Sequence, residues 1–301
     1  MKKPNLFIVG APKSGTTALS QYLSEHPNVF MTTPKEPNYF SDDMPKRYIA
    51  RSLEDYLLLF KNSNSSHSVS GEASVFYLYS SCALQNIYNF NNQAKIIVLL
   101  RNPVDIVYSL HSQYVYNFVE DEKDFEKAWN LQESRRIGLN LPINSRVPKI
   151  LQYKDVAMLG NQVEKLFNIF PNDQVKLILF DDFVDSTKKV YEDVLRFLGV
   201  PTFRKVSFTR VNENKIPRFF KLNRFLHNPP DFIRKIVRSL YKTSGIDAGE
   251  IIMRFILNLN SRKVERKRMP PDFRKKLITE FQEDIHKLSK FINRDLSHWE
   301  K

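Results

Sequence analysis

Short apolar runs along this chain alternate with segments whose apolar residues recur at helical spacing. The runs at residues 6–9, 95–100 and 175–180 are long enough for buried parallel strands and too short for core helices. A shorter run at residues 29–31 predicts one more strand. Strands that alternate with helices in this way predict an α/β protein.

The segments between and after these runs have the spacing of amphipathic helices. We expect helices that begin at Thr16 and Pro103, and others over residues 52–60, 124–135, 155–169, 187–198, 231–258 and 272–292. Residues 211–218 are polar and basic, and we expect a loop there. No internal repeat or clear boundary divides residues 1–301, so we expect one domain with a basic helical flank from about residue 203.

Composition and charge narrow the class of protein. Cys82 is the single cysteine, which excludes an internal disulfide and a thiolate metal cluster. Residues 1–3 lead directly into the first strand and no apolar run approaches about 20 residues, so we expect a cytoplasmic protein without a signal peptide or transmembrane segment. Residues 203–301 hold 24 Lys and Arg against 11 Asp and Glu, and this imbalance is the whole net charge of +13. A basic flank indicates an anionic partner, although solvated helix faces have the same composition.

The first candidate site follows the first strand. Gly10 and Gly15 bracket a tight loop before the helix that begins at Thr16, so backbone N–H groups and the helix dipole point at an anion, normally a phosphate. Nucleotide-binding loops of NTPases have a lysine at the position of Thr16, which reaches the β- and γ-phosphates. Here the lysine is Lys13, inside the loop, and this predicts a shorter or different anion. A glycine turn with an incidental lysine is the alternative.

A second candidate site follows the strand at residues 95–100. Arg101 comes directly after that strand, at the carboxyl edge of the expected sheet, where a guanidinium can bind a phosphate by two hydrogen bonds. Pro103 suits the first turn of a helix, and Ser109 further along that helix can reach the same anion. NTPases commonly end such a strand with an acid for Mg²⁺, and here an arginine takes that place.

Together these two segments resemble the sulfotransferases that use the activated sulfate donor PAPS. The stretch from Pro12 to Thr17 is similar to their 5′-phosphosulfate loop, and Arg101-Asn102-Pro103 with Ser109 is similar to their 3′-phosphate site. The resemblance covers nearly the whole chain and includes bacterial and heparan-sulfate-type enzymes. It implies a P-loop-type, three-layer α/β fold with a central parallel sheet flanked by helices. It also implies in-line transfer of the sulfuryl group from PAPS to an acceptor hydroxyl. The basic flank favours a carbohydrate, an anionic glycan, as the acceptor, and a small alcohol, a phenol or a lipid stays open.

The resemblance assigns roles to individual residues. Those expected to contact PAPS are Lys13, Ser14, Gly15, Thr16 and Thr17 at its 5′-phosphosulfate, Arg101 and Ser109 at its 3′-phosphate, and Lys215 and Arg218 in a basic lid. Lys13 is also expected to act in catalysis, by neutralising charge on the departing bridging oxygen. The product is PAP, and no metal is required because lysine and arginine supply the positive charge. For the lid residues, a solvated loop is the alternative.

Three residues are candidates for the catalytic base. Glu36 lies in a proline-bounded loop beside Tyr39 and Phe40, although by spacing alone an ion-paired surface glutamate is the simpler interpretation. Related enzymes have a similar Lys-Glu-Pro-x-aromatic-Phe segment whose Glu is the base, so Glu36 is our choice. Glu72 and His111 are the alternatives, and His111 lies roughly 200° around its helix from the expected phosphate-binding serine.

Two positions depart from the pattern of the family. Glu72 falls where related enzymes place a Glu-Lys-Thr or Lys-Ser segment, but Ala73 stands in place of the lysine. Ala18 stands where many cytosolic sulfotransferases have a tryptophan that stacks on adenine. The role of the missing lysine is therefore absent or taken by another residue, and the adenine platform comes from elsewhere.

Two other classes of protein stay as alternatives. A P-loop nucleotide kinase or NTPase would need a lysine in place of Thr16 and an acid in place of Arg101. A nucleic-acid-binding protein would use the basic last third, but no recognisable motif or stacking array is present, so no nucleic acid partner is expected. The sequence favours no oligomeric state, and family resemblance does not transfer the identity of an acceptor.

Overall fold

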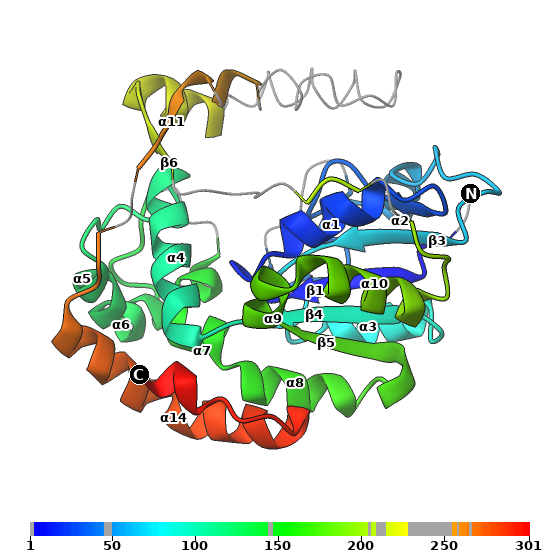
Figure 1. Cartoon of the computed structure of the whole chain (residues 1–301). Helices are drawn as coiled ribbons and strands as arrows, with labels where there is room; N and C mark the ends of the chain where they lie inside the picture. Colours follow the sequence, from blue (N-terminus) through cyan, green and yellow to red (C-terminus); the bar gives the residue numbers. More distant parts are fainter. Residues whose placement is uncertain are drawn as a thin grey trace. The chain divides into compact units, whose positions relative to one another are not determined.

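The structure is a computed structural model that describes residues 3–44, 50–143, 147–203, 206–208, 215–227, 255–257, 259–264 and 267–301 (Figure 1). Its contacts divide the chain into two units. Unit 1 comprises Met1–Val107, Tyr153–Asn212 and Pro270–Lys301, and unit 2 comprises Tyr108–Gln152 and Glu213–Met269. The single-domain organisation expected from the sequence stays a prediction.

Unit 1 is built on a sheet of five strands in the order β2-β3-β1-β4-β5, and every neighbouring pair is parallel. The strands are β1 (Leu6–Gly10), β2 (Val29–Met31), β3 (Val69–Ala73), β4 (Lys95–Leu100) and β5 (Val175–Leu179). At the centre, Leu6 of β1 pairs with Gly71 on one side and with Lys95 on the other. All four predicted strands are confirmed.

Strand β3 was not predicted, because its sequence is largely polar. All five of its residues are nevertheless buried. Its polar side chains find partners inside the fold: the Ser70 hydroxyl lies 2.6 Å from that of Ser63, and the Glu72 carboxylate accepts hydrogen bonds from buried hydroxyls. Satisfied polar groups of this kind can be buried at little cost, so polarity did not exclude a central strand.

Helices cover both faces of the sheet (Figure 1). On one face, Ile8 joins an apolar core with α1 (Thr16–Ser24), α9 (Phe180–Asp185) and α10 (Thr187–Leu198). On the other face, Phe7 begins an aromatic cluster through Phe40 with Tyr56 of α2 (Leu53–Leu58) and Phe90 of α3 (Ala83–Phe90). This arrangement follows from the alternation of side chains along β1, and it confirms the expected three-layer α/β fold.

The last long helix of unit 1, α14 (Pro271–Ile292), packs against α8 (Leu159–Phe167). The Asp284 carboxylate accepts hydrogen bonds from the backbone N–H groups of Gly160 (2.7 Å) and Asn161 (2.9 Å). A Cβ atom at Gly160 would come within 2.5 Å of the Asp284 carbonyl oxygen, so the close approach requires glycine there. The helix predicted over residues 272–292 is confirmed.

Several expected elements are divided or shortened. The segment at 124–135 forms two helices, and that at 155–169 is interrupted at Met158, whose ψ of 71° leaves the helical region. The remaining elements are α4 (Pro103–Tyr116), α5 (Phe125–Asn130), α6 (Gln132–Arg136), α7 (Tyr153–Ala157), α11 (Phe220–His227), and the 3₁₀ turns η1 (Pro148–Leu151), η2 (Asn172–Gln174) and η3 (Ser297–Glu300). Helix α4 begins in unit 1 and continues into unit 2.

The polar segment at 211–218 is only partly the loop that we expected. Within it, β6 (Lys215–Pro217) pairs antiparallel with β7 (Ser261–Lys263) in unit 2, and this pairing satisfies backbone groups that the sequence pattern left unassigned. Residues 211–214 and most of the helix expected over 231–258 lie outside the described residues. In the part of the chain that is described, no helix combines the length and hydrophobicity needed to cross a membrane.

Candidate functional site

Four segments that follow the carboxyl ends of parallel strands carry the candidate site residues of unit 1. Residues 11–15 follow β1, residues 32–40 follow β2, Ser74 follows β3 and Arg101 follows β4. Because the strands are parallel, these ends meet at one edge of the sheet, which is where open α/β folds bind their ligands. Residues 11–17 form the anion loop, and residues 35–40 form the Lys-Glu loop.

The anion loop has the geometry that its glycine pattern predicts. Gly15 is the N-cap of α1 with a φ of 89°, and a Cβ atom there would lie 3.1 Å from the ring of Phe183. Lys13 also has a left-handed backbone, with a φ of 62°. Such a conformation costs a non-glycine residue about 1–3 kcal/mol and is concentrated at functional sites. Ser14 and Thr16 are buried, so the predicted turn of strand, loop and helix N-terminus is present.

A second lysine lies at this loop, which the sequence did not assign to it. The Lys35 ammonium donates to the hydroxyls of Thr17 (3.0 Å) and Thr16 (3.4 Å), and its side chain is only 16% exposed. The same ammonium group forms an ion pair with the Glu36 carboxylate at 3.8 Å. The Lys35 ammonium therefore contacts the N-terminus of α1, directly after the loop that contains Lys13. In this structure the position beside Glu72 that holds a lysine in relatives is the buried Ala73.

Glu36 is held by its backbone and more open at its side chain. Its φ is 59°, its N–H donates to the Ala73 carbonyl at the end of β3 (3.1 Å), and its side chain is 38% exposed. The Lys-Glu loop is further fixed by Tyr39, whose ring stacks on that of Tyr56 with centroids 4.7 Å apart. A carboxylate fixed at its backbone and accessible at its oxygens is suited to accept a proton from a bound molecule.

Arg101 contacts the anion loop directly. Its guanidinium donates to the Lys13 carbonyl (2.9 Å), lies 4.5 Å from the ring centroid of Phe180 and forms an ion pair with Asp105 at 3.9 Å. Burial lowers the pKa of Arg101, but the guanidinium stays charged at neutral pH. The contact holds the backbone of the left-handed Lys13, which is a role that the sequence did not predict.

Glu72 is close to these groups but buried. Its carboxylate is 1% exposed and accepts hydrogen bonds from the hydroxyls of Tyr56 (3.0 Å), Tyr77 (2.9 Å) and Ser74 (2.6 Å). Burial, and to a smaller extent the Glu36 carboxylate, raise the pKa of Glu72, while the three hydroxyls lower it; the net result is a pKa of about 7. A carboxylate enclosed in this way is out of reach of an acceptor molecule.

The remaining candidates belong to unit 2. Ser109 and His111 are buried on α4, and the His111 Nε2 atom lies 2.8 Å from the Glu122 carbonyl oxygen. Burial lowers the pKa of His111, and this hydrogen bond lies within unit 2. Arg218 is exposed, and its N–H and Nε groups donate to the carbonyls of residues 260 and 261. The Lys215 backbone belongs to β6, while its side chain lies outside the described part; the roles of Ser109, Lys215 and Arg218 stay predictions.

Two further expectations concern the residue that stacks on adenine and the lack of a metal ion. Ala18 belongs to the apolar core cluster between α1 and the sheet, and the residue that stacks on adenine stays unassigned. Within the described ranges, no group of three or more His, Cys, Asp or Glu side chains could hold a metal ion.

Comparisons with known proteins agree with this geometry. A family model described as the sulfotransferase domain matches residues 3–235. Over 104 residues the chain is 35% identical to the membrane-associated sulfotransferase kil1 of Dictyostelium discoideum. This match covers 34% of this chain and 21% of that protein. Over 255 residues it is 26% identical to carbohydrate sulfotransferase 15 of Homo sapiens. This match covers 65% of this chain and 44% of that protein. The chain therefore spans less than half the length of either relative.

One solved structure is similar along the entire chain. The crystal structure of a sulfotransferase from Alicyclobacillus acidocaldarius has a TM-score of 0.74 and 28% sequence identity, and the match covers 100% of both chains. Its similarity extends the agreement beyond the segment that the family model covers.

Proposed function

Since this chain belongs to the sulfotransferase domain family, we propose that it transfers the sulfuryl group of PAPS to a hydroxyl group of a carbohydrate. The observation that carries the proposal is the gathering of Lys13, Lys35 and Glu36 around the start of α1. An ammonium group on the first residues of a helix, with a second lysine in the loop before them, suits a phosphosulfate, and the neighbouring carboxylate suits the proton that the acceptor loses.

The proposed reaction is a single in-line displacement. The acceptor oxygen attacks sulfur, the bond between sulfur and the bridging oxygen breaks, and PAP leaves with that oxygen. The acceptor proton passes to the Glu36 carboxylate. Lys13 and Lys35 neutralise the charge that develops on the bridging and sulfuryl oxygens, so positioning and electrostatics supply most of the rate enhancement, as in phosphoryl transfer. The scheme requires no metal ion.

The donor contacts in this proposal are those that the sequence predicts, with Lys35 added. They are Lys13, Ser14, Gly15, Thr16, Thr17 and Lys35 at the 5′-phosphosulfate, Arg101 and Ser109 at the 3′-phosphate, and Lys215 and Arg218 in the lid. The support for Arg101 is its place after β4, at the same sheet edge as the anion loop that it contacts.

The proposed acceptor class rests on relatives and on charge. Carbohydrate sulfotransferase 15 and heparan sulfate N-deacetylase/N-sulfotransferases are among the proteins that this chain resembles. Residues 203–301 carry the whole net charge of +13, which favours an anionic glycan over a neutral alcohol.

The proposal is tested by presenting labelled PAPS to the full chain with heparan-type and chondroitin-type glycans, a simple sugar and a phenol. We expect label on a glycan. Glu36→Gln should lower turnover by about 10²- to 10⁴-fold with PAP affinity intact, while the exposed Glu54→Gln should match the unmodified protein. Label on no acceptor contradicts the proposed reaction. A Glu36→Gln protein that keeps more than about a third of the turnover contradicts the base.

A further inference from the structure

Glu72 is a buried carboxylate that the proposed reaction does not use. Three hydroxyl groups donate to it, from Tyr56 and Tyr77 on one oxygen and from Ser74 on the other. In the described part of unit 1, no lysine or arginine forms an ion pair with it. A hydroxyl group has a single proton to donate, so each of these three has its direction fixed by the carboxylate.

Two of the same hydroxyl oxygens also accept hydrogen bonds from the Lys-Glu loop. The backbone N–H of Asn38 donates to the Ser74 hydroxyl (3.2 Å), and that of Phe40 donates to the Tyr77 hydroxyl (3.3 Å). Each hydroxyl therefore links one loop amide to one oxygen of Glu72. Chains of this kind polarise their members, so a change at the carboxylate is felt at the amides.

The third hydroxyl supports the same loop through an aromatic ring. Tyr56 donates to Glu72 and stacks on Tyr39 of the loop, with an interplanar angle of 15°. The ring of Phe40 also packs edge-on against Tyr56, with centroids 5.2 Å apart. All three residues from 38 to 40 are thus held by groups that converge on a single carboxylate.

We propose that Glu72 is the positioning residue of the Lys-Glu loop, because its carboxylate orients the three hydroxyls that hold this loop beside the anion loop. The proposal rests on the proposed function only in giving Lys35 and Glu36 their roles in sulfuryl transfer. Glu72 touches neither donor nor acceptor in this scheme.

The ionised and the protonated carboxyl groups cannot hold the network in the same way. The ionised group accepts all three O–H bonds, whereas the protonated group must itself donate to one of its neighbours, whose own proton then loses its acceptor. The groups that face Glu72 are the Tyr56, Tyr77 and Ser74 hydroxyls and the Glu36 carboxylate, which is itself paired with Lys35. Because the pKa of Glu72 is about 7, this change falls near neutral pH.

The test follows the two loop amides by NMR in the isotopically labelled full chain, without donor or acceptor. We expect the amide shifts of Asn38 and Phe40 to titrate with a midpoint near pH 7, and this titration to vanish in Glu72→Gln. Glu54→Gln, an exposed change on α2, is the matched control and should leave both titrations unchanged. Ser74→Ala should remove the response of Asn38 and leave that of Phe40, and Tyr77→Phe should do the reverse. These two single-link variants keep the test decisive if Glu72→Gln folds poorly.

Amides that do not titrate, or that still titrate in Glu72→Gln, overturn the proposal. With labelled PAPS, Glu72→Gln should reduce kcat by about 10- to 100-fold, the scale of a slightly misplaced catalytic group, and should abolish any acidic limb near pH 7. If the unmodified protein transfers no label, the proposed function fails, while the amide titrations still decide the role of Glu72.

Discussion

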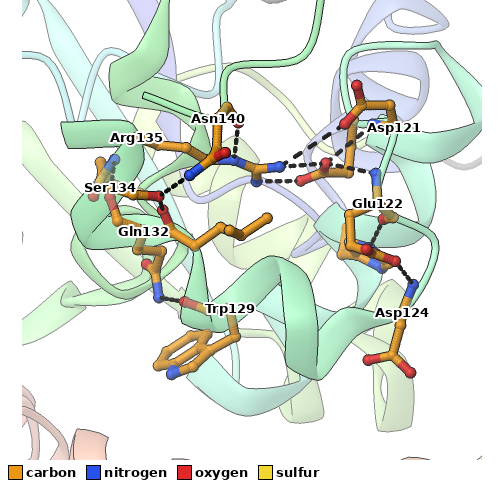
Figure 2. A network of polar contacts seen from close by, with 12 residues as sticks. Asp121, Glu122, Asp124, Trp129, Gln132, Ser134, Arg135 and Asn140 are labelled. Carbon is orange, nitrogen blue, oxygen red and sulfur yellow. Dashed lines mark hydrogen bonds and ion pairs between the residues drawn. The ribbon is translucent and has the colours of Figure 1, made fainter. Parts of the chain in front are cut away.

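Two regions of this molecule bury a glutamate. One pairs it with an arginine, and the other surrounds it with hydroxyl groups. In unit 2, Glu120 is 3% exposed and receives both ends of the Arg135 guanidinium, at 2.6 and 2.8 Å. Figure 2 shows Arg135 between Asp121 and Asn140, whose carbonyl accepts a third hydrogen bond from it. The backbone N–H groups of residues 121 and 122 also donate to Glu120. In unit 1, by contrast, the partners of Glu72 among the described residues are hydroxyl groups only.

The difference separates a structural charge from a responsive one. The Arg135 guanidinium binds Glu120 inside unit 2, and this bidentate pair leaves few of its donor and acceptor atoms for another ligand to contact. Around Glu72 the cations are directed elsewhere: Lys35 contacts the anion loop and Arg101 contacts the Lys13 carbonyl. The buried acid of unit 1 therefore stays able to gain and lose a proton, and its neighbours carry that change to the Lys-Glu loop.

The largest expected effect breaks the structural pair. Arg135→Met leaves the Glu120 carboxylate buried without its cation and should lower the free energy of unfolding by about 3–5 kcal/mol. Urea unfolding measures this change. The double variant Glu120→Gln with Arg135→Met removes both charges and should be closer in stability to the unmodified protein. A double variant that is less stable than Arg135→Met would contradict the account of the pair.

Removing a cation from the site in unit 1, in contrast, should reduce activity rather than stability. Lys13→Ala should lower kcat with labelled PAPS by about 10²- to 10³-fold, because Lys13 is proposed to act on charge that develops in the transition state. PAP affinity should change much less. Lys189→Ala, an exposed change on α10, is the control. An unchanged kcat with a raised KM for PAPS would show that Lys13 only anchors the ground state.

A smaller effect distinguishes the two glutamates by pH. The pKa of Glu72 is about 7 in the fold against an ordinary value of 4.5, so between these values the native state binds more protons than the unfolded state. Stability then falls as the pH rises through this window, by about 2–3 kcal/mol from pH 5 to pH 8. Glu72→Gln should lose this slope in urea unfolding, and Glu120→Gln should keep it. Equal slopes for the unmodified protein and Glu72→Gln would contradict the buried titration.

The sequence predicted those parts of the fold and site that depend on neighbouring residues. Apolar runs located four of the five strands of unit 1, and the spacing of Gly15 and Lys13 located the anion loop, because strand burial and turn chemistry are local. Strand β3 was missed because the partners that satisfy its polar side chains, such as Tyr56 for Glu72, lie far along the chain.

The same reason explains what was missed in the site. Lys35 contacts Thr17 only because the ends of β1 and β2 lie at the same edge of the sheet, and no local sequence pattern predicts that contact. The contact of Arg101 with the Lys13 carbonyl likewise joins residues far apart in sequence. Sequence motifs therefore gave the residue types of the site, and the sheet topology determined which of them meet.

The central claim is that the anion loop and Arg101 bind the two ends of a 3′-phosphorylated nucleotide, and calorimetry with PAP and AMP tests it without an acceptor. We predict that the unmodified protein prefers PAP by about 10- to 100-fold, since charge-assisted contacts to the 3′-phosphate are worth about 1.5–3 kcal/mol and AMP lacks that group. Because Arg101 also holds the Lys13 carbonyl, Arg101→Ala should weaken both ligands and bring their ratio close to one. Equal affinities of the unmodified protein for PAP and AMP would contradict the claim.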